Sequence, residues 1–374
     1  MKKTLIISYS HISVDPRVKK QIEALQQDYE IHTAAKSGIE RIKHFDINYS
    51  LKFSLIRKIK RLSYYLTKNY EKIYWDNSKK QFLNKNNFDS YDLIIANDIS
   101  ALPLAFAIKQ KHTKIYFDAH EYHPREFEDN LQWRLLHQGV INYMCKKYIP
   151  RVDIFTTVGE EIAKEYENFI GIKPIVIKNA TKFQDIDVIK TEKYPIKFVH
   201  HGAAIPSRKL ELMIDVFKNL PSEKYHLYFI LVGDEKYIDK LKKYAQSNKN
   251  IYFEKAVKQD VLTQILNKFD LGIYILEPSN FNNLNALPNK LFDFIQARLG
   301  IVISPNPEMK NLVEKFNLGL VSDDYSVKSM IKTINQLNID KVNQFKDWSD
   351  KVAYDLSSEK EIEKIRMIVN KILN

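Results

Sequence analysis

The sequence has 374 residues, too many for one ordinary domain, so two domains are expected. Its composition, 44% hydrophobic and 28% charged, is typical of soluble globular proteins and argues against a disordered chain, and no stretch approaches the roughly 20 apolar residues of a membrane-spanning helix. The formal net charge of +12 indicates an anionic partner, with nucleic acid, anionic lipid and nucleotide phosphates as candidates.

The first apolar run and the single cysteine both favour a cytoplasmic protein. Residues 5–7 follow a charged start and are too few for a signal-peptide core, so they predict a buried strand. Cys145 cannot form an internal disulfide, which fits a reducing compartment, and its apolar helical surroundings predict a buried structural thiol. No Cys/His cluster has metal-ligand spacing, so no metal site is expected.

The first half of the chain alternates short apolar runs with segments at helical spacing. The expected strands are residues 5–7, 93–96, 115–117, 154–158 and 175–177. The expected helices are residues 17–25 and 101–110. This alternation predicts βαβ units around a parallel sheet, in an N-terminal domain of residues 1–180.

The pattern weakens over residues 178–194, a predicted linker, and then restarts. The expected strands are residues 197–202, 228–234, 251–253, 271–275 and 301–303, the last of which would complete the sheet. The expected helices are residues 210–219, 237–246, 259–267 and 289–298. We therefore expect a second doubly wound domain over residues 193–340, and a helical tail, 341–374, that packs on the N-terminal domain. Two such domains place ligands at the carboxyl ends of their strands, in a crevice between them.

The loop after the first strand lacks the G-x-G-x-x-G pattern of dinucleotide enzymes, which argues against an NAD or FAD site. Asp15 is a suitable helix N-cap, with Pro16 at the first helical position. That assignment leaves His11 and Arg17 to face a ligand.

A second polar segment follows the strand at 115–117. His120 and Glu121 are placed there for proton handling or for binding sugar hydroxyls, and a satisfied loop histidine is the alternative. Asp98 follows the preceding strand. Because neighbouring parallel strands end at one edge of a sheet, Asp98 should lie near His120.

Two segments of the second half combine a helix start with cations. A predicted glycine turn at Gly202 precedes Arg208 and Lys209, a combination that can hold a diphosphate. Pro288 suits a first helical turn, so free amides near Asn289 and Lys290 would face a ligand. Asp293, one turn further along, could bind ribose hydroxyls. The alternative for this segment is an ordinary solvent-facing helix start.

Residues 51–75 hold seven cations and one acid, interleaved with aliphatic and aromatic side chains. A basic amphipathic helix of this kind binds anionic membrane surfaces. An ordinary helix with a solvated basic face is an equal alternative. Nucleic-acid binding is disfavoured because no nucleic-acid motif accompanies the charge.

The order of these segments resembles the family 4 retaining glycosyltransferases, which have the GT-B fold of two Rossmann-like domains. The second half carries His-Gly, then Arg-x-Leu-Glu, then Leu-Val-Gly-Asp, then Asn-x-Leu-Pro-Asn-Lys-Leu-Phe-Asp-Phe. Asp-Pro-Arg-Val and Asp-Ala-His-Glu in the first half are similar to segments of that family's first domain. The resemblance spans nearly the whole chain.

The resemblance implies that the C-terminal domain binds a nucleoside diphosphate sugar. Asn285 and Asp293 occupy the positions of the family's Glu-x7-Glu pair, which contacts the donor sugar and the ribose, so an amide replaces one carboxylate. Ala203 takes the place of a usual arginine. The residues implied at the diphosphate are Arg208, Lys209, Asn289 and Lys290, and those implied at the nucleotide are Asp293, Gly233 and Lys255.

His120 matches the family's histidine that reaches the donor sugar or the acceptor, and is implied to be catalytic together with Asn285 and Asp293. The implied acceptor side consists of His11, Asp15, Arg17, Asp98 and Glu121. The reaction would move a hexose or N-acetylhexosamine, by default from a uridine diphosphate, to a hydroxyl of a lipid-linked or cell-envelope glycan. It would proceed with retention, by front-face attack, without a metal, a cofactor or a protein nucleophile.

Two other functions fit the same fold. One is a sugar-nucleotide epimerase, which would isomerise the donor without an acceptor. The other is a non-catalytic binding protein, suggested by Asn285. The short first apolar run and the single cysteine place any of the three in the cytoplasm. The inner face of the plasma membrane is a possible site of attachment through residues 51–75.

Overall fold

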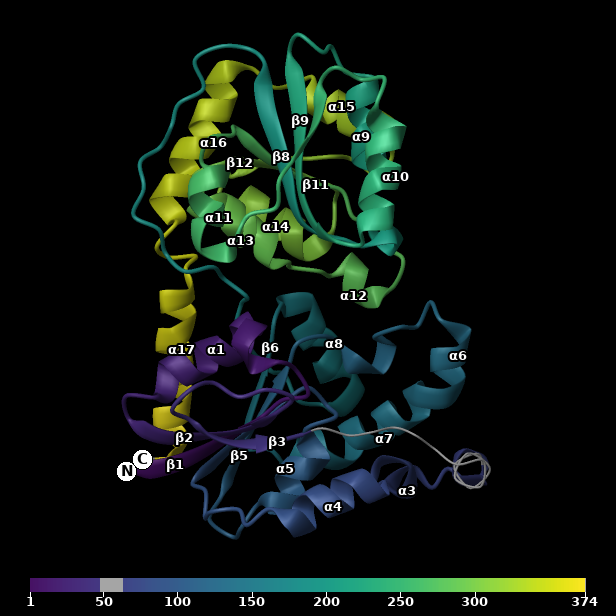
Figure 1. Cartoon of the computed structure of the whole chain (residues 1–374), viewed down its shortest axis with the longest axis vertical. Coiled ribbons are helices and arrows are strands. Elements are labelled where there is room, and N and C mark those ends of the chain that lie inside the picture. Colours follow the sequence, from purple (N-terminus) through teal and green to yellow (C-terminus); the bar gives the residue numbers. More distant parts are fainter. Residues whose placement is uncertain (48–62, 374) are drawn as a thin grey trace. The chain divides into compact units, whose positions relative to one another are not determined.

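The computed structural model describes residues 1–47 and 63–373, which form two compact units (Figure 1). The first unit consists of Met1–Lys178, Asn280–Asn282 and Glu361–Asn374. The second consists of Asn179–Ser279 and Asn283–Lys360. Each unit contains one parallel sheet that is covered by helices on both faces. This arrangement confirms the predicted α/β class with two doubly wound domains.

The sheet of the first unit has seven parallel strands in the order β3-β2-β1-β4-β5-β6-β7. These strands are β1 (Lys2–Ile7), β2 (Tyr29–Ala35), β3 (Lys43–Asp46), β4 (Leu93–Asn97), β5 (Lys114–Ala119), β6 (Ile154–Thr157) and β7 (Ile175–Val176). The strand order reverses between β1 and β4. In open parallel sheets, this is the point where loops diverge and ligands bind.

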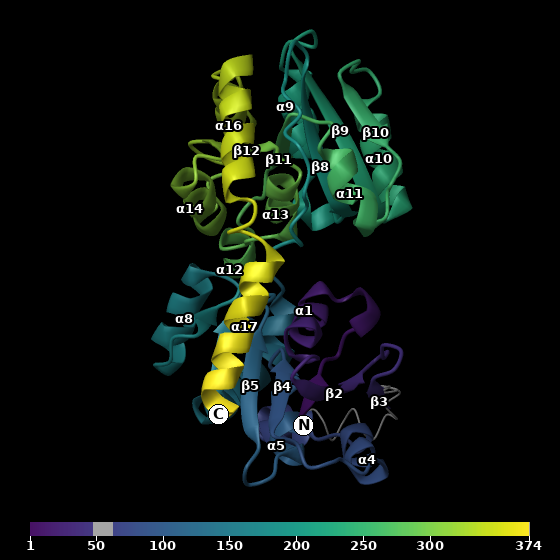
Figure 2. The ribbon, with the colours of Figure 1, turned by 90° about the vertical axis from the view of Figure 1, so that its left-hand side faces the viewer.

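Alternate residues of these strands pack on opposite faces of the sheet. One face carries α3 (Tyr70–Tyr74), α4 (Asn77–Lys85), α5 (Leu102–Ile108), α7 (Gly139–Tyr148) and α8 (Glu160–Ile170). The other face carries α1 (Pro16–Leu25) and α17 (Ser358–Leu373) (Figure 2). The side chains of Ile362, Ile365 and Val369 in α17 are buried there. Cys145 is fully buried in α7 as a free thiol, as predicted.

The sheet of the second unit has six parallel strands in the order β10-β9-β8-β11-β12-β13. They are β8 (Ile196–Ala204), β9 (Tyr225–Gly233), β10 (Ile251–Glu254), β11 (Leu271–Tyr274), β12 (Gly300–Ile303) and β13 (Gly319–Val321). One face is covered by α9 (Glu211–Lys218), α10 (Glu235–Ala245), α15 (Val327–Ile334) and the start of α16 (Ile339–Val352). The other is covered by α11 (Gln259–Leu266), α13 (Asn289–Gln296) and α14 (Pro307–Lys315).

The sequence missed three strands. β2 contains Glu30, His32 and Thr33, which break the apolar run. They are accommodated because His32 bonds to Tyr91 and Glu30. β3 and β13 are short and partly exposed, so neither carries a strong pattern. Residues 301–303 therefore do not complete the second sheet, because β13 pairs beside them.

The C-terminal tail divides between the two units, whereas one tail packed on the N-terminal domain was expected. Val342, in α16, is buried in the core of the second unit. Only the chain from Glu361, in α17, belongs to the first. No helix among residues 1–47 and 63–373 is both long and apolar enough to cross a membrane.

Most of the predicted basic helix, residues 51–62, lies outside the described residues. Over 63–75 the helical structure is interrupted before α3. Tyr64, Tyr65, Tyr70 and Trp75 pack against the core of the first unit. This described part therefore contributes side chains to the core, and membrane attachment through residues 51–75 stays a prediction.

Candidate functional site

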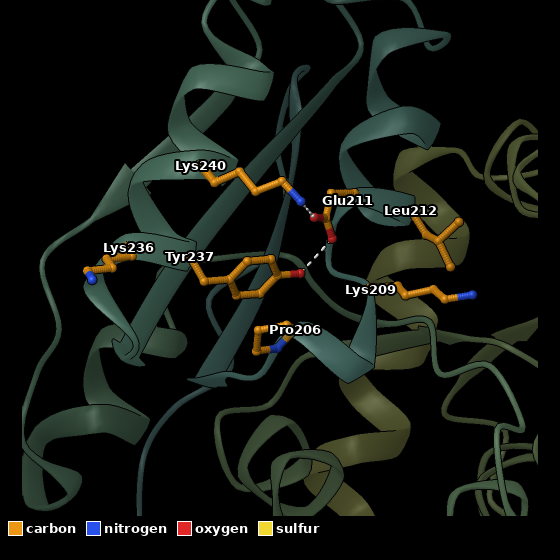
Figure 3. A pocket seen from close by; sticks show the side chains of 7 residues that line it. All are labelled: Pro206, Lys209, Glu211, Leu212, Lys236, Tyr237 and Lys240. Carbon is orange, nitrogen blue, oxygen red and sulfur yellow. Dashed lines mark hydrogen bonds and ion pairs between the residues drawn. The ribbon is translucent and has the colours of Figure 1, made fainter. Parts of the chain in front are cut away.

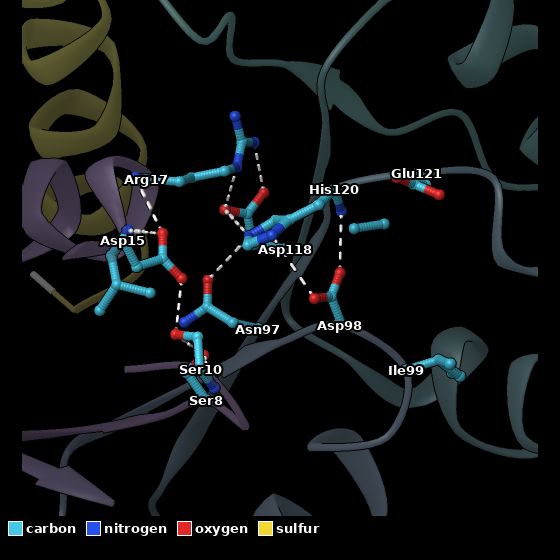
Figure 4. Close-up of polar contacts among 12 residues, drawn as sticks. Ser8, Ser10, Asp15, Arg17, Asn97, Asp98, Ile99, Asp118, His120 and Glu121 are labelled. Carbon is cyan, nitrogen blue, oxygen red and sulfur yellow. Dashed lines mark hydrogen bonds and ion pairs between the residues drawn. The ribbon is translucent and has the colours of Figure 1, made fainter. Parts of the chain in front are cut away.

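Polar side chains gather in the first unit where β1, β4 and β5 end (Figure 4). Asp98 directly follows β4 and has a φ of 65°, in the left-handed region that non-glycine residues seldom adopt. Such strain persists where the surrounding contacts hold it, and it is concentrated at functional sites. The carboxylate of Asp98 accepts from the backbone N–H of His120 at 3.2 Å, and this contact joins the two loops.

Arg17 and Asp118 form a buried ion pair in this cluster. Arg17 Nε and Nη2 donate to the two carboxylate oxygens of Asp118 at 2.7 and 2.5 Å, and both side chains are at most 5% exposed. Gln21 and Thr156 also donate to that carboxylate. Although burial raises the pKa of Asp118, Arg17 and His120 lower it well below its usual range. The expectation that Arg17 is available to a ligand is therefore wrong.

His120 lies between acidic and amide oxygens. Its Nδ1 is 3.4 Å from Asp98 Oδ2, and its Nε2 is 3.2 Å from Asn97 Oδ1 and 3.7 Å from Asp118 Oδ2. Burial lowers the pKa of His120, but Asp98 and Asp118 raise it by more than burial lowers it, so the net shift is upward. An imidazolium with both ring nitrogens facing acceptors can donate hydrogen bonds or stabilise an anion. The raised pKa of His120 favours this protonated form.

His123 extends the network on the other side of Asp98. Its Nε2 lies 3.2 Å from Asp98 Oδ1 and its Nδ1 lies 3.1 Å from Glu126 Oε2. Burial lowers the pKa of His123, but the two carboxylates outweigh it and raise the pKa. Burial also raises the pKa of Asp98, but His120 and His123 hold it at about 2. The cluster is thus a chain of compensated charges.

A cavity of about 410 Å³ opens beside this network within the first unit. Its polar lining consists of Asp98, Ser100, His120, Glu121, His123, Glu126 and His137. Its apolar lining consists of Ile99, Val140, Ile141 and Met144. Three predicted residues, Asp98, His120 and Glu121, thus line one cavity.

The remaining residues predicted for the acceptor side lie in the loop after β1. Asp15 caps α1, because its Oδ1 accepts from the N–H groups of Arg17 and Val18, and its Oδ2 accepts from Ser10 Oγ at 2.6 Å. Pro16 begins the helix, as predicted. His11 is exposed beside Ser37. Neither Asp15 nor His11 lines the cavity.

In the second unit, Lys290 and Gly202 come together where β8 approaches α13. Gly202 has a φ of 112° and lies within β8, which continues to Ala204, so the predicted turn is wrong. A Cβ placed on Gly202 would lie 3.9 Å from Lys290 Nζ, so the ammonium group rests close to this bare backbone. α13 can pack closely on the sheet because Gly272 has no side chain. A Cβ at Gly272 would lie only 2.2 Å from the Phe294 ring.

Lys290 is a buried cation without a charged hydrogen-bond partner in the contacts described for it. Its Nζ lies 3.3 Å from His200 Nε2 and 3.9 Å from the centroid of the Tyr274 ring. Burial, and secondly Arg208, lower the pKa of Lys290 well below its usual range, while Asp293 opposes them. The site therefore disfavours the charged ammonium form, and an added anion would stabilise that form.

His200 accommodates this cation as a neutral ring. Its Nδ1 faces the carbonyl oxygen of Ile273 at 3.0 Å, which requires a proton on Nδ1 and leaves Nε2 to accept from Lys290. Burial and Lys290 both lower the pKa of His200. The same two causes lower the pKa of the neighbouring His201 to about 3.

Asp293 lies one turn into α13. Its Oδ1 accepts from Thr181 Oγ1 at 2.6 Å, and its Oδ2 is 3.5 Å from His201 Nε2, a buried atom with no hydrogen-bond partner among the residues that the structure describes. Burial raises the pKa of Asp293 to about 6. Two unsatisfied or weakly satisfied polar atoms thus face each other beside Lys290.

The other predicted donor residues lie at different depths. Arg208 is half-buried in a short 3-10 turn, Pro206–Arg208, and Lys209 pairs with Glu277 on the surface. Asn285 is buried. Asn289 is exposed as the first residue of α13, and Pro288, expected inside the helix, precedes it as the N-cap without a side-chain cap.

The second unit also contains the two remaining residues predicted at the nucleotide, and a separate hollow. Gly233 ends β9 with a φ of 108°, and Lys255 is exposed after β10. A hollow of about 600 Å³ lies between α9 and α10, where Tyr237 and Lys240 both donate to Glu211 (Figure 3). Of the predicted donor residues only Lys209 lines it, so this hollow is distinct from the Lys290 cluster.

Sequence reasoning missed several members of both clusters. They are His123, Glu126, His137, Thr181, His200, His201 and Tyr274. The two histidines of β8 were visible as a His-His-Gly run at the end of a strand. A polar pair in an otherwise apolar buried strand is such a signal, because burial of an imidazole needs a partner.

No protein-family model matches this sequence, and no curated protein sequence does either. HepE of Anabaena, solved in complex with UDP-glucose, is a similar structure: it is 14% identical, with a TM-score of 0.67 over 99% of this chain and 100% of that one. A glycosyltransferase from Rickettsia africae is 11% identical, with a TM-score of 0.68 over 100% and 99% of the chains. The same identity and coverage hold for a sucrose-phosphate synthase from Thermosynechococcus elongatus, whose TM-score is 0.70. At these identities the likeness shows the fold: this chain has two Rossmann-like units of the GT-B type.

Proposed function

We propose that this protein is a glycosyltransferase in which the second unit binds a nucleoside diphosphate sugar and the first unit binds the acceptor. The observation that carries the proposal is the position of Lys290, a buried ammonium group next to bare backbone at Gly202 and under the influence of Arg208. Two cations near one another in a partly desolvated site gain most from a ligand with two adjacent negative charges.

A diphosphate meets this requirement. Its charge would reverse the sign of the electrostatic interaction at Lys290, and the first-turn amides of α13 would add donors. The fold supports the same class of ligand, because HepE, with a similar fold, was solved with UDP-glucose. We therefore propose a UDP-linked hexose or N-acetylhexosamine as the donor.

The proposed reaction proceeds with retention and needs no protein nucleophile. The bond between the anomeric carbon and the diphosphate oxygen breaks, and the acceptor oxygen bonds to the same face of that carbon. The acceptor's proton passes to the departing diphosphate oxygen. Lys290 and Arg208 stabilise the leaving group without a metal, Asp293 accepts from the ribose, and Asn285 contacts the sugar.

In the first unit, we propose that His120 contacts the donor sugar or the acceptor as a hydrogen-bond donor from the cavity wall. Asp98 and Glu121 would accept from acceptor hydroxyls. We further propose a lipid-linked or cell-envelope glycan as acceptor and a cytoplasmic location. Attachment to an anionic membrane through residues 51–75 stays a prediction.

The test is donor binding by the whole chain, measured by thermal shift and isothermal titration calorimetry with UDP-glucose, UDP-N-acetylglucosamine and GDP-mannose. A donor present at 100 times its Kd should stabilise the native state by about 2.7 kcal/mol. Lys290→Met should abolish this response. The matched control is Lys236→Met, at an exposed lysine of α10 outside the Lys290 cluster. If no nucleotide sugar binds the wild type, the proposal is wrong.

Asn285 favours one second candidate, a binding protein without transferase activity, because a buried amide stands where the resembled family has a carboxylate. Both candidates bind donor. They differ when an acceptor is added, since only a transferase then releases free nucleoside diphosphate. An epimerase would instead isomerise the donor sugar with no acceptor present.

A further inference from the structure

A line of apolar side chains runs along the helical segment that borders the cavity of the first unit. The segment consists of α6 (Leu131–Trp133), a π-helical turn (Arg134–Gln138) and α7. Leu131 and Leu135 are 62% and 72% exposed, whereas Val140 and Met144 are buried and line the cavity. We call these four residues the apolar stripe.

The π-helical turn keeps the stripe in line. In an α-helix the side chain above position i belongs to residue i+4, but in a π-turn it belongs to i+5. The spacings within the stripe are four residues from Leu131 to Leu135, five from Leu135 to Val140 across the π-turn, and four from Val140 to Met144. Without the π-turn, Leu135 would stand over Gly139. Single π-turns of this kind are often found at functional sites.

The cavity that the stripe enters has a lining of two chemical kinds. Asp98, Glu121 and Glu126 supply carboxyl oxygens, to which hydroxyl groups could donate. Ile99, Ile141 and two stripe residues supply apolar surface. A ligand that fills this space therefore has both a hydroxyl-rich part and an apolar part.

We propose that the acceptor is an amphipathic glycoside: its hydroxyl-bearing head occupies the cavity, and its aliphatic chain lies along the apolar stripe. This rests on the proposed function, which assigns the cavity to the acceptor. Leu131 and Leu135 are then specificity-determining residues, since their exposed surface is covered only when the acceptor carries a chain.

The charge around the stripe distinguishes this occupant from a membrane surface. Residues 125–148, which contain the whole stripe, hold four cations and three acids. Arg125 pairs with Glu128, Glu126 pairs with His123, and Lys147 pairs with Glu71. Because these pairs leave almost no surplus of cations, the segment attracts anionic lipid only weakly. Continuity with the cavity instead indicates a chain covalently joined to the head group.

The segment is also held in a defined conformation. Phe127 and Trp133 pack edge to face with ring centroids 5.9 Å apart, and Asn130 caps α6 by accepting from Trp133 N. Its leucines are therefore exposed on an ordered helix. A preformed surface of this kind loses little entropy when it binds a flexible chain.

The experiment measures the Kd of methyl, hexyl, octyl and decyl β-glucoside, each below its micelle concentration, by calorimetry on the whole protein. For the wild type we expect the Kd to fall about fourfold per methylene that reaches the stripe. In the double variant Leu131→Ser/Leu135→Ser this dependence should flatten between octyl and decyl, with binding of methyl glucoside unchanged. Met367→Ser, at a methionine of α17 that is 72% exposed elsewhere in the first unit, is the matched control and should keep the dependence.

Three results would overturn the inference: a wild-type Kd independent of chain length, a dependence that survives in the double variant, or binding to vesicles of phosphatidylglycerol that is lost in the double variant while glucosides fail to bind. Unfolding temperatures of the variants show whether they fold. Donor binding is measured separately with UDP-glucose. If the stripe binds chains but no nucleotide sugar binds, the inference about the stripe holds and the proposed function fails.

Discussion

The two polar clusters of this protein are built on opposite electrostatic plans. In the first unit, charges of opposite sign alternate: Arg17 pairs with Asp118, and His120 and His123 both face Asp98. In the second unit, Lys290 bonds to the neutral ring of His200 and lies within the field of a second cation, Arg208. In the first cluster each charge faces one of opposite sign, whereas in the second cluster the charge of Lys290 is not balanced by a bonded carboxylate.

This difference separates buried charges that are paired within the fold from a buried charge that is not. Removing one member of a buried ion pair leaves the other charge buried without a partner, which lowers the free energy of unfolding. Removing a cation that is buried with little compensation takes away a cost the native state already bears. The two units should therefore respond to the loss of one buried cation with opposite changes in stability.

The largest effect is expected for Arg17→Met. It leaves the Asp118 carboxylate buried without its bidentate partner, and should lower the free energy of unfolding of the first unit by about 3–5 kcal/mol. Amide hydrogen exchange of peptides from β1, β4 and β5, measured in increasing urea, localises the loss to this unit.

The control for Arg17→Met is the double variant Arg17→Met/Asp118→Asn. It removes both charges, while the amide oxygen can still accept from Thr156. Its cost should be smaller than that of Arg17→Met alone. A double variant as damaging as the sum of the two single changes would mean that packing, and not charge compensation, dominates the first unit.

Lys290→Met tests the opposite expectation in the second unit. The substitution replaces a buried ammonium group by an apolar side chain of similar length, and should raise the free energy of unfolding by about 1–4 kcal/mol. Urea unfolding of the ligand-free protein measures this change. A loss of stability would show that the contacts with His200 and the Tyr274 ring outweigh the desolvation of the cation, and would break the comparison.

Asp293 gives the second unit a pH dependence with a defined sign. Burial raises the pKa of Asp293 to about 6, against 3.8 for an exposed aspartate, so the folded state holds its proton more tightly. The stabilisation from this group is complete below about pH 4 and is lost as pH rises through 6, to a total of about 3 kcal/mol at most. Asp293→Asn removes it, so the stability of the variant relative to wild type should rise from pH 4 to pH 7.

Unfolding temperatures of the two proteins between pH 4 and pH 7 measure that difference. Asp239→Asn, at an exposed position of α10, is the matched control, and its difference from wild type should not vary over the same range. A difference for Asp293→Asn that is constant with pH would show that its carboxyl group titrates alike in the folded and unfolded chains.

The sequence predicts the fold well because buried parallel strands are short apolar runs, and the intervening helices repeat at 3.6 residues. The prediction fails where tertiary partners override that pattern. β2 tolerates Glu30 and His32 because the side chains beside it pair with them. β13 pairs beside β12 with only three residues, fewer than any periodicity can reveal.

For the sites, local rules succeed and long-range pairings fail. The Asp-Pro sequence identifies the cap of α1, since capping involves neighbouring residues only. The pairing of Arg17 with Asp118 depends on how α1 docks against β5, and nothing within either segment specifies it. The π-turn before α7 is hidden for a related reason: it moves the helical register by one residue and leaves composition unchanged.

The smallest effect, expected for Asp15, decides whether it belongs to the fold or to the acceptor site. Asp15→Ala removes the acceptor for the N–H groups of Arg17 and Val18, and should cost about 1 kcal/mol of stability. Asp15→Asn keeps an oxygen at the cap and should restore most of it. With both variants fully folded at the assay temperature, the KM for acceptor should stay at the wild-type value, because Asp15 does not line the cavity. If Asp15→Asn instead restores stability but still raises the KM, the carboxylate itself contacts acceptor, and the compensated network of the first unit extends to the substrate.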